Sequence, residues 1–374
     1  IIVPSAAVSG VLEDAGAAGV KSATIYAAGL GDGDDPKSKQ RGAWLADFIA
    51  RSGMRISGPN CMGAFSFRER LFAYPNAQLC ALPPGPVGLV FQSGGTLQFY
   101  MQSAADRGLR FSYCVSSGNE PDLDLADYVN FLVDDPETHT IVLFIEGLRR
   151  PAAFMHAAAR ALAATKPILA IKTGQSQGAA AAARSHTGAI AGDHAAFLAM
   201  CDRLGIVVCR SLDDLVETAL AFQCRRWPKG PRIGWVTTSG GTVDLLYDCM
   251  EREQGVLAAF SEDTKSALLP VMQEGILPRN PLDVGLPSNN EAAANWCRIV
   301  LEDANVDMVG WAAQLPRKGT GLGDVAPLKR LLDVTDKPIL GFGRMVHQMS
   351  PEMQTAMDTA GFPYLQGLEP TIRA

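Results

Sequence analysis

The chain carries an internal repeat of a strand, a glycine-rich turn and a helix, and this repeat constrains the fold more than any other feature. Residues 87–96 have the sequence Val-Gly-Leu-Val-Phe-Gln-Ser-Gly-Gly-Thr, which aligns with Ile-Gly-Trp-Val-Thr-Thr-Ser-Gly-Gly-Thr at 233–242. Lys-Pro-Ile-Leu also recurs, at 166–169 and 337–340. The matching order of these motifs indicates a duplication of whole domains. Short apolar runs alternate with longer amphipathic segments from end to end, which predicts an α/β protein with parallel sheets.

The order of the apolar runs predicts three domains, over residues 1–80, 81–226 and 227–374. The first is predicted to be the second half of a doubly wound domain that lacks its first strands. Several prolines predict a linker near 74–86, and the stretch 225–231 connects the second domain to the third. The strands expected in the first two domains are 23–27, 55–57, 87–91, 111–115, 140–145 and 168–172, and the helices expected are 6–18, 39–52, 96–107, 122–132, 151–164, 193–204 and 212–222.

Composition excludes several classes of protein. Hydrophobic residues make up 47% of the chain and charged residues 19%, which is typical of a globular protein rather than a disordered, collagen-like or coiled-coil one. The net charge of -6 and the lack of a Lys/Arg cluster in the sequence argue against nucleic acid as a partner. The longest uncharged stretch, between Arg70 and Asp106, contains Pro-Pro-Gly-Pro at 83–86, so no transmembrane segment is expected.

The eight cysteines lie scattered along the sequence, with no C-x-x-C pair and no Cys/His spacing that suits zinc. No metal site is therefore expected on this chain. The cysteines are predicted to be thiols of a reducing compartment, which places the protein in the cytoplasm. The chain begins Ile-Ile-Val-Pro, without the basic region or cleavage site of a signal peptide, and the start of the first domain is expected to lie upstream.

Each repeat places Ser-Gly-Gly-Thr between an apolar strand and a helix. The N-terminus of such a helix presents unpaired backbone N–H groups and the positive end of the helix dipole, and glycine lets an oxyanion approach the backbone closely. A tight turn with a Ser or Thr cap explains either copy alone equally well. Two copies at the carboxyl ends of strands favour a phosphoryl group held between two helix ends. The candidate phosphate-binding residues are Ser93, Gly94, Gly95, Thr96, Ser239, Gly240, Gly241 and Thr242.

One histidine has an unusual setting. His186 lies in Ser-His-Thr-Gly-Ala-Ile-Ala-Gly (185–192), a small-residue segment with little apolar packing to bury it. A neutral imidazole, with a reference pKa of about 6.5, is a nucleophile at pH 7 and can carry a phosphoryl group on one nitrogen. An ordinary exposed side chain is the alternative. The other histidines, at 139, 156, 194 and 347, have no comparable setting and are expected to be structural.

A carboxylate follows one of the predicted strands. A phosphorylated imidazole needs its other nitrogen held in one tautomer, and a carboxylate does this well. Glu146 is the candidate, because it comes directly after five apolar residues and must find a partner or solvent there. An exposed acid at the end of a strand is the alternative. Gly118 and Asn119 also follow a strand, and they are candidates for substrate binding or for simple turn chemistry.

Taken in order, these motifs resemble the nucleoside-diphosphate-forming acyl-CoA synthetases, the family of ADP-forming acetyl-CoA synthetase and succinyl-CoA synthetase. The resemblance covers essentially the whole chain, and its most specific element is Ser-His-Thr-Gly at 185–188. It implies a CoA-binding Rossmann domain truncated at its start, followed by two flavodoxin-like ligase domains. The other motifs that carry the resemblance are Gly-Pro-Asn-Cys-Met-Gly at 58–63, Gln-Ser-Gly-Gly at 92–95, Ser-Gly-Asn at 117–119, and Glu146 after its strand.

The resemblance also implies roles for single residues. His186 would be transiently phosphorylated, Glu146 would orient it, and Asn60 and Cys61 would lie near CoA. The two Ser-Gly-Gly turns would begin the helices whose ends grip the phosphate. The given sequence contains neither the glycine-rich CoA loop nor an ATP-grasp domain, so it resembles an α subunit or an α-like portion of a longer polypeptide. ATP with Mg²⁺ is expected to bind an ATP-grasp domain or β subunit outside this chain, within an oligomer.

The activity that the resemblance implies is that of an acid:CoA ligase, an acyl-CoA synthetase that forms ADP. ATP phosphorylates the histidine, a small carboxylic acid takes the phosphoryl group, and the CoA thiol displaces phosphate from the acyl phosphate. One alternative is a ligase-like regulatory module that binds CoA or acyl-CoA without ligation, although such a module has no need of a phosphorylatable histidine. A second alternative is a flavodoxin-like nucleotide-binding or scaffold protein whose Ser-Gly-Gly turns hold another phosphate.

Overall fold

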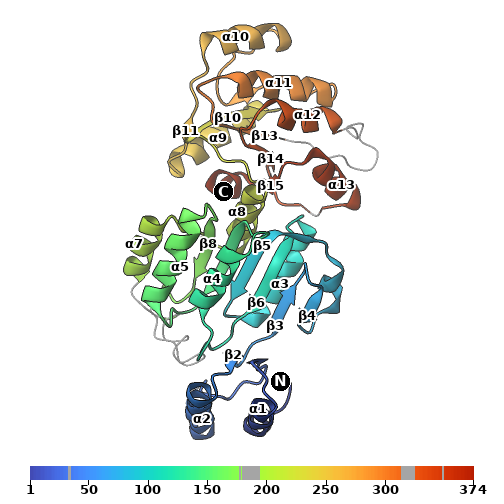
Figure 1. Cartoon of the computed structure of the whole chain (residues 1–374). Helices are drawn as coiled ribbons and strands as arrows, with labels where there is room; N and C mark the ends of the chain where they lie inside the picture. The colour runs from blue at the N-terminus through green and yellow to red at the C-terminus, as the bar shows by residue number, and fades with distance from the viewer. Residues whose placement is uncertain (33–34, 177, 179–193, 313–324, 348) are drawn as a thin grey trace. The chain divides into compact units, whose positions relative to one another are not determined.

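The computed structural model describes residues 1–32, 35–176, 178, 194–312, 325–347 and 349–374. The described residues form two compact units (Figure 1). The first comprises Ile1–Ala105 and Leu109–Leu215, and the second comprises Asp106–Gly108 and Val216–Ala374. The division into domains 1–80, 81–226 and 227–374 stays a prediction.

The first unit opens with two parallel strands and two helices. β1 (Ser22–Thr24) pairs with β2 (Arg55–Ser57), and α2 (Pro36–Ser52) lies between them in the sequence. Asp35 caps the start of α2 by accepting the N–H of Ser38, and Gly53, with a φ of 65°, ends the helix. Apolar residues at helical spacing form a core shared by α1 (Val8–Ala17), α2 and the strands: Val8, Leu12, Ile25, Leu45, Phe48 and Ile56.

A seven-stranded sheet follows, in the order β4-β3-β6-β5-β7-β8-β9. The five strands from β6 to β9 in this order run parallel, whereas β3 and β4 form an antiparallel hairpin that adds to β6. The central strand β7 is apolar and buried along its whole length, which is typical of a parallel strand with both faces covered. The strands are β3 (Gly63–Ser66), β4 (Leu71–Ala73), β5 (Pro84–Phe91), β6 (Phe111–Ser116), β7 (Thr140–Ile145), β8 (Ile168–Lys172) and β9 (Val207–Val208).

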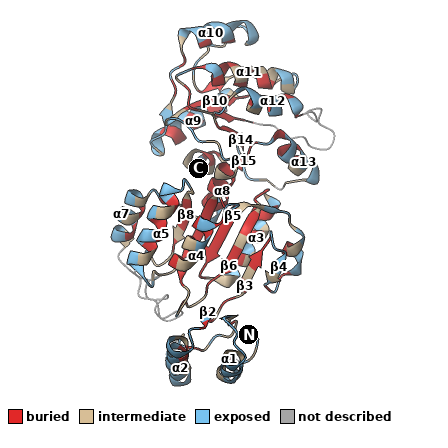
Figure 2. Ribbon diagram, viewed as in Figure 1, coloured by how far each residue is buried: buried red, intermediate tan, exposed pale blue. Residues whose placement is uncertain are grey.

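Helices cover this sheet, so that its strands are buried while the outer faces of the helices are exposed (Figure 2). On one face α4, α5 and α7 pack together over Val90, Leu143 and other alternate strand residues. The intervening residues, such as Leu89 and Val142, point to the opposite face and are equally buried. The helices are α3 (Gly94–Asp106), α4 (Leu125–Asp134), α5 (Pro151–Ala163) and α7 (His194–Leu204), and α8 (Leu212–Gln223) begins in this unit and continues in the second.

The second unit has a six-stranded parallel sheet, in the order β11-β10-β13-β14-β15 with β12 paired to the end of β10. Trp235 of β10 fills its centre, edge-on to Phe342 at a centroid distance of 5.2 Å. The strands are β10 (Arg232–Thr237), β11 (Val256–Leu257), β12 (Leu282–Asp283), β13 (Met308–Trp311), β14 (Ile339–Gly343) and β15 (Tyr364–Gln366). The helices are α9 (Gly240–Arg252), α10 (Glu262–Leu268), α11 (Asn290–Glu302), α12 (Ala326–Val334), α13 (Pro351–Ala360) and α14 (Leu368–Arg373).

Both large sheets share one topology. Numbering the repeated strands in chain order, β6-β5-β7-β8-β9 and β11-β10-β13-β14-β15 both have the order 2-1-3-4-5. This is the doubly wound, flavodoxin-like order, in which the connections leave the first strand and the third in opposite directions and create a crevice at their carboxyl ends. The predicted α/β class and the two flavodoxin-like parallel sheets are therefore confirmed. The crevice is expected between β5 and β7 in the first unit and between β10 and β13 in the second.

The sequence patterns located most elements of the first unit. The predicted strands 55–57, 140–145 and 168–172 match the observed bounds, whereas the strand predicted at 23–27 is observed at 22–24. The β3–β4 hairpin was missed. Its loop is the charged run Arg-Glu-Arg at 68–70, and strands of three or four residues give too short an alternation to distinguish from a linker.

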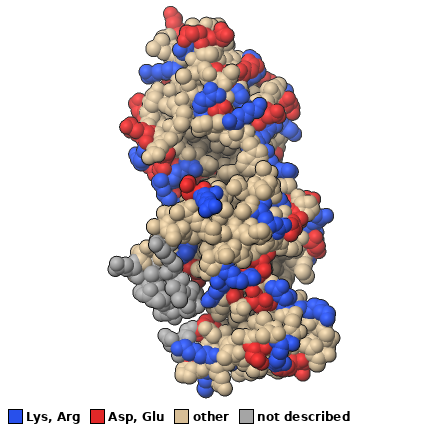
Figure 3. All heavy atoms as spheres, turned by 60° about the vertical axis from the view of Figure 1, so that its left-hand side comes forward, with Lys and Arg blue, Asp and Glu red and all other residues tan. Residues whose placement is uncertain are grey.

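Charges of both signs are interspersed on the face of the molecule drawn in Figure 3, and neither sign gathers into a large patch there. Many of the exposed charges are paired, as in the contacts that Arg51 makes with Glu13 and Asp47. Within the described ranges, no helix has both the length and the apolar character needed to cross a lipid bilayer.

Candidate active site

The first Ser-Gly-Gly turn joins β5 to α3 at the crevice of the first sheet. Ser93 caps the helix: its Oγ lies 2.9 Å from the Thr96 hydroxyl and accepts the Thr96 N–H at 3.4 Å. The N–H of Leu97 bonds the Ser93 carbonyl, which begins the helical pattern. A Cβ added to Gly95 would meet no atom within 4 Å, so packing does not require glycine at this position. The capped turn is thus observed, and phosphate binding by Ser93, Gly94, Gly95 and Thr96 stays a prediction.

Gly94 has a packing role as well. A Cβ at this position would lie 2.6 Å from Cγ of Met62 and 2.9 Å from Oγ of Ser116. The Gly94 carbonyl also accepts a hydrogen bond from the Tyr74 hydroxyl at 2.8 Å. Glycine at 94 therefore lets β3 and its flanking residues close against the start of α3.

Gln92, which precedes the turn, joins it to the end of β7 by hydrogen bonds. Its side-chain Oε1 accepts the N–H groups of Glu146 at 2.5 Å and of Gly147 at 3.0 Å. Its Nε2 donates to the Gly147 carbonyl and to Oε2 of Glu120, both at 2.8 Å. The sequence analysis included this buried Gln in the motif Gln-Ser-Gly-Gly but assigned it no role.

Glu146 lies at the same edge of the sheet, half-buried at the end of β7. Its carbonyl accepts a hydrogen bond from Nζ of Lys172 at 2.9 Å. Burial lowers the pKa of Lys172, and the neighbouring Glu146 carboxylate opposes part of that shift. The structure therefore links the backbone of Glu146, through Gln92, to the residue before the Ser93 turn, and an orienting role for the Glu146 carboxylate stays a prediction. His186 lies outside the described residues, so its proximity to Glu146 stays a prediction.

The loop after β6 meets the segment that carries Asn60. The Asn119 N–H bonds the Pro59 carbonyl at 3.0 Å, and Nδ2 of Asn60 donates to Oδ1 of Asn119 at 3.3 Å. Gly118 has a φ of +67°, and a Cβ there would lie 2.2 Å from the Pro59 carbonyl oxygen. Three of the predicted binding residues, Asn60, Gly118 and Asn119, are thus brought together.

Cys61 belongs to this cluster but does not present its thiol. The residue is 5% exposed and its Sγ–H points to the Ile25 carbonyl at 3.3 Å. Burial raises the pKa of the thiol to about 11, so it stays protonated at neutral pH. The side chain of Cys61 is therefore a packing group, and a place for this residue near CoA stays a prediction.

Glu120 is a second residue that the sequence analysis missed. Its carboxyl group is buried and accepts hydrogen bonds from the Ser117 hydroxyl at 2.6 Å and from Nε2 of Gln92 at 2.8 Å. Burial is the main cause that raises its pKa, to about 7. No periodicity marks Glu120 in the sequence, because it follows a turn and its φ of +57° is left-handed.

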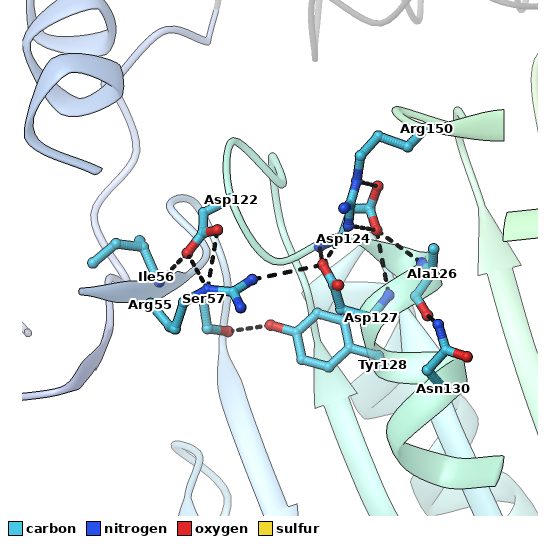
Figure 4. Close-up of polar contacts among 10 residues, drawn as sticks. All are labelled: Arg55, Ile56, Ser57, Asp122, Asp124, Ala126, Asp127, Tyr128, Asn130 and Arg150. Carbon is cyan, nitrogen blue, oxygen red and sulfur yellow. Dashed lines mark hydrogen bonds and ion pairs between the residues drawn. The ribbon is translucent and has the colours of Figure 1, made fainter. Parts of the chain in front are cut away.

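A cavity of about 490 Å³ lies between this loop and the start of the chain. Two ion pairs hold its wall (Figure 4). Asp122 accepts the Ile56 N–H at 2.7 Å and pairs with Arg55 at 3.1 Å, and Asp124 pairs with Arg150 at 2.6 Å. Asp124 also caps α4, which fixes the loop against that helix. The cavity is lined by Leu30, Gly31, Gly42, Asn119, Glu120, Pro121, Asp122, Asp124, Arg149 and Arg150.

The second Ser-Gly-Gly turn is held differently. Ser239 precedes α9 without a side-chain cap. Arg344, directly after β14, donates from Nε to the Thr242 hydroxyl at 2.5 Å and from Nη2 to the Thr238 hydroxyl at 2.7 Å. A guanidinium group therefore lies beside the turn formed by Ser239, Gly240 and Gly241. The sequence analysis missed Arg344. It follows a five-residue apolar strand directly, as Glu146 does, and the same argument could have found it.

We expect Gly118→Ala to destabilise the first unit by about 2–3 kcal/mol, because the new Cβ must enter the space of the Pro59 carbonyl in a left-handed backbone conformation. Urea unfolding measures the change. Gly10→Ala in α1 is the matched control, since a Cβ there meets nothing within 4 Å and should be neutral or slightly stabilising. Equal stability of Gly118→Ala and the wild type would show that the loop does not approach Pro59 as described.

The raised pKa of Glu120 makes stability depend on pH. A folded-state pKa of about 7, against 4.5 when unfolded, means that the folded protein holds this proton more tightly. The stabilisation is complete below about pH 4.5 and is lost as pH rises through 7, by up to ~3 kcal/mol. In urea unfolding from pH 4.5 to 8, Glu120→Gln should therefore gain stability relative to the wild type as pH rises. A constant difference at every pH would contradict the burial of an ionisable group at this position.

Three comparisons with known proteins agree with the motifs. The family model of the succinyl-CoA ligase like flavodoxin domain matches residues 84–222. The chain is 35% identical over 298 residues to a trans-feruloyl-CoA synthase of an unknown prokaryotic organism, covering 78% of this chain and 42% of that protein. It is 31% identical over 310 residues to subunit alpha of the ADP-forming acetate–CoA ligase II of Pyrococcus furiosus, covering 83% and 66% respectively.

A solved structure extends the likeness to the whole chain. The acetyl-coenzyme A synthetase 1 of Ca. Korarchaeum cryptofilum, in complex with phosphate and ADP, matches with a TM-score of 0.85 at 25% identity. The match covers 100% of this chain and 80% of that one. The chain spans 42% and 66% of the lengths of the two relatives above. Together with the repeated flavodoxin-like sheets and the shared motifs, these likenesses confirm the expected family: the chain belongs to the nucleoside-diphosphate-forming acyl-CoA synthetases.

Proposed function

We propose that the protein is an acid:CoA ligase that makes an acyl-CoA from a carboxylic acid, CoA and ATP, with ADP and phosphate as the other products. The observation that carries this proposal is the Gln92 amide, which joins the Ser93 turn to Glu146 at the crevice of the first sheet. A phosphohistidine needs donors for its phosphate and an orienting partner for its imidazole, and this link holds a helix N-terminus and the backbone of Glu146 at the same edge of the sheet. The names of the relatives, an ADP-forming acetate–CoA ligase and a trans-feruloyl-CoA synthase, support the same reaction class.

The reaction proceeds in three transfers. The terminal phosphoryl group of ATP moves to a ring nitrogen of His186, and ADP leaves. An oxygen of the substrate carboxylate then attacks this phosphorus, which frees the imidazole and forms an acyl phosphate. The CoA sulfur finally attacks the acyl carbon, losing its proton, and phosphate departs with the oxygen that came from the acid. Splitting one condensation into three steps in this way is the usual advantage of covalent catalysis.

Each of the two Ser-Gly-Gly turns offers donors that suit a phosphoryl group. Phosphoryl transfer depends chiefly on positioning and on neutralising charge, and a helix N-terminus does both. In the first turn the donors are the backbone N–H groups of Gly94 and Gly95 and the hydroxyls of Ser93 and Thr96. In the second turn the donors come from Ser239, Gly240, Gly241 and Thr242. The Arg344 guanidinium adds a full positive charge beside them.

CoA and the acid meet at the loop after β6 in this proposal. Asn60 and Asn119 hold each other beside a cavity large enough for part of a CoA molecule or for an acyl group. Gly118 lets the two loops approach closely, which keeps both asparagines in place. Because its thiol is buried and protonated, Cys61 contributes backbone contacts to CoA and no nucleophile.

ATP with Mg²⁺ binds an ATP-grasp domain or β subunit outside this chain, and the assembly is an oligomer. One relative is named an alpha subunit, which supports a partner of this kind. The Korarchaeum protein holds ADP and phosphate, the ligands that such an assembly would bind. We place the protein in the cytoplasm, on the ground that its scattered cysteines suit a reducing compartment.

Labelled ATP tests this function directly. The chain with its ATP-grasp domain or subunit, given γ-³²P-ATP, should acquire acid-labile, base-stable label on the chain. We expect His186→Asn to abolish this label and acyl-CoA formation, because asparagine cannot carry the phosphoryl group. His156→Asn is the matched control, since His156 is exposed on α5 and should label normally.

The possible outcomes separate the candidate functions. Label that survives His186→Asn would contradict the assignment of the phosphorylated residue. Binding of CoA without acid-dependent release of ADP would favour the regulatory module instead. A folded wild-type assembly that neither takes up the label nor binds CoA would favour the scaffold protein.

A further inference from the structure

The side-chain amide of Gln92 uses all of its hydrogen-bonding groups. Its carbonyl accepts two backbone N–H groups, from Glu146 and Gly147, and its NH₂ donates to the Gly147 carbonyl and the Glu120 carboxyl. Rotating the amide by half a turn would place its NH₂ against two N–H donors, so only one orientation is satisfied. Whatever holds the amide in this orientation therefore also holds the backbone at Glu146.

Glu120 is the side chain that completes this arrangement. Each of its carboxyl oxygens has a partner, Ser117 for Oε1 and Gln92 for Oε2. The residue is 3% exposed and its backbone has a left-handed φ of +57°, a conformation that a non-glycine residue keeps only where the surroundings fix it. Its place in the loop is thus set both by the turn and by two hydrogen bonds at the end of the side chain.

Glu120 also lines the cavity, together with its neighbour Asn119 and with Arg149. The charged and titratable groups near it come from three elements: Asp124 and Asp122 on its own loop, Tyr128 on α4, and Arg149 and Arg150 after β7. Asp124 disfavours the ionised carboxylate and Arg149 favours it. An anion entering the cavity would therefore act on Glu120 in the same direction as Asp124.

We infer that Glu120 is a positioning residue of the ligase site. It fixes the Gln92 amide, and through that amide the backbone of Glu146, relative to the loop that lines the cavity. The inference rests on the proposed function. Its ionised carboxylate accepts charge-assisted hydrogen bonds from Gln92 and Ser117, which are stronger than the bonds of the neutral acid. The protonated acid can keep both contacts if the Ser117 hydroxyl turns to accept, but it holds them less firmly. Ionisation near neutral pH thus tightens the link between the cavity and Glu146.

The test is the pH dependence of ligation by the complete enzyme, the chain with its ATP-grasp domain or subunit. Acyl-CoA formation is measured from pH 5.5 to 9, with kcat and the KM for CoA determined at each pH. We expect kcat of the wild type to rise about five- to tenfold through a step near pH 7, the gain from turning neutral hydrogen bonds into charge-assisted ones. Glu120→Gln keeps the shape and both contacts but cannot ionise. It should stay at the low-pH rate throughout, with its KM for CoA unchanged.

Two further variants make the result independent of folding. Ser117→Ala removes the hydroxyl that stabilises the ionised form, so it should move the step to higher pH without abolishing it. Glu137→Gln, at an exposed acid remote from these contacts, should leave the step in place. If Glu120→Gln fails to fold, the shift in Ser117→Ala decides the question.

The results that would overturn this role differ from those that would overturn the ligase. A wild type that makes no acyl-CoA from any acid removes the proposed function itself. An active wild type without a step near pH 7, or a Glu120→Gln enzyme that retains the step, leaves the ligase intact and removes Glu120 from the positioning role. A step that stays at the same pH in Ser117→Ala would also remove Glu120 from the positioning role.

Discussion

One buried amide holds the edge of the first sheet together. Gln92 lies where β5 gives way to the Ser-Gly-Gly turn, and its side chain satisfies three backbone groups of the turn after β7. Without it, two N–H groups and a carbonyl at the crevice would need other partners, and unpaired buried groups of this kind each cost about 1–3 kcal/mol. The amide also bonds Glu120, so it ties the loops after β5, β6 and β7 into one structure. The candidate site depends on this arrangement, since each loop contributes residues to it.

The Ser-Gly-Gly turns of the two repeats are held in place by different side chains. Gln92 and Thr238 occupy equivalent places before their Ser-Gly-Gly turns. The first turn is capped by Ser93 and braced by an amide, whereas the second lacks a side-chain cap and is braced by the Arg344 guanidinium. Duplication therefore preserved the strand order and the helix N-terminus while the bracing side chains diverged.

Sequence patterns predicted the repeat, the doubly wound class and the bounds of several central strands, because apolar runs of five or six residues leave a clear period. They also located Glu146 and Asn119, since a polar residue after such a run must lie at the edge of the sheet. They did not reveal Glu120 or Arg344, and they gave Gln92 no role beyond its place in the Gln-Ser-Gly-Gly motif. Their roles depend on hydrogen bonds between residues 28 to 106 positions apart, which no local period records. The β3–β4 hairpin was missed for a related reason, because it is held by pairing with β6, a strand that begins some forty residues later in the chain.

The oxygen balance of the reaction tests most directly whether the acid is activated by a phosphoryl group at this edge of the sheet. The substrate would be a carboxylic acid labelled with ¹⁸O in both oxygens, turned over by the complete enzyme with unlabelled ATP and CoA, and the products analysed by mass spectrometry. An acyl phosphate passes one acid oxygen to the departing phosphate, so each turnover should give one ¹⁸O in inorganic phosphate and none in ADP. Label in a nucleotide product, or phosphate without label, would contradict the route through the phosphorylated histidine.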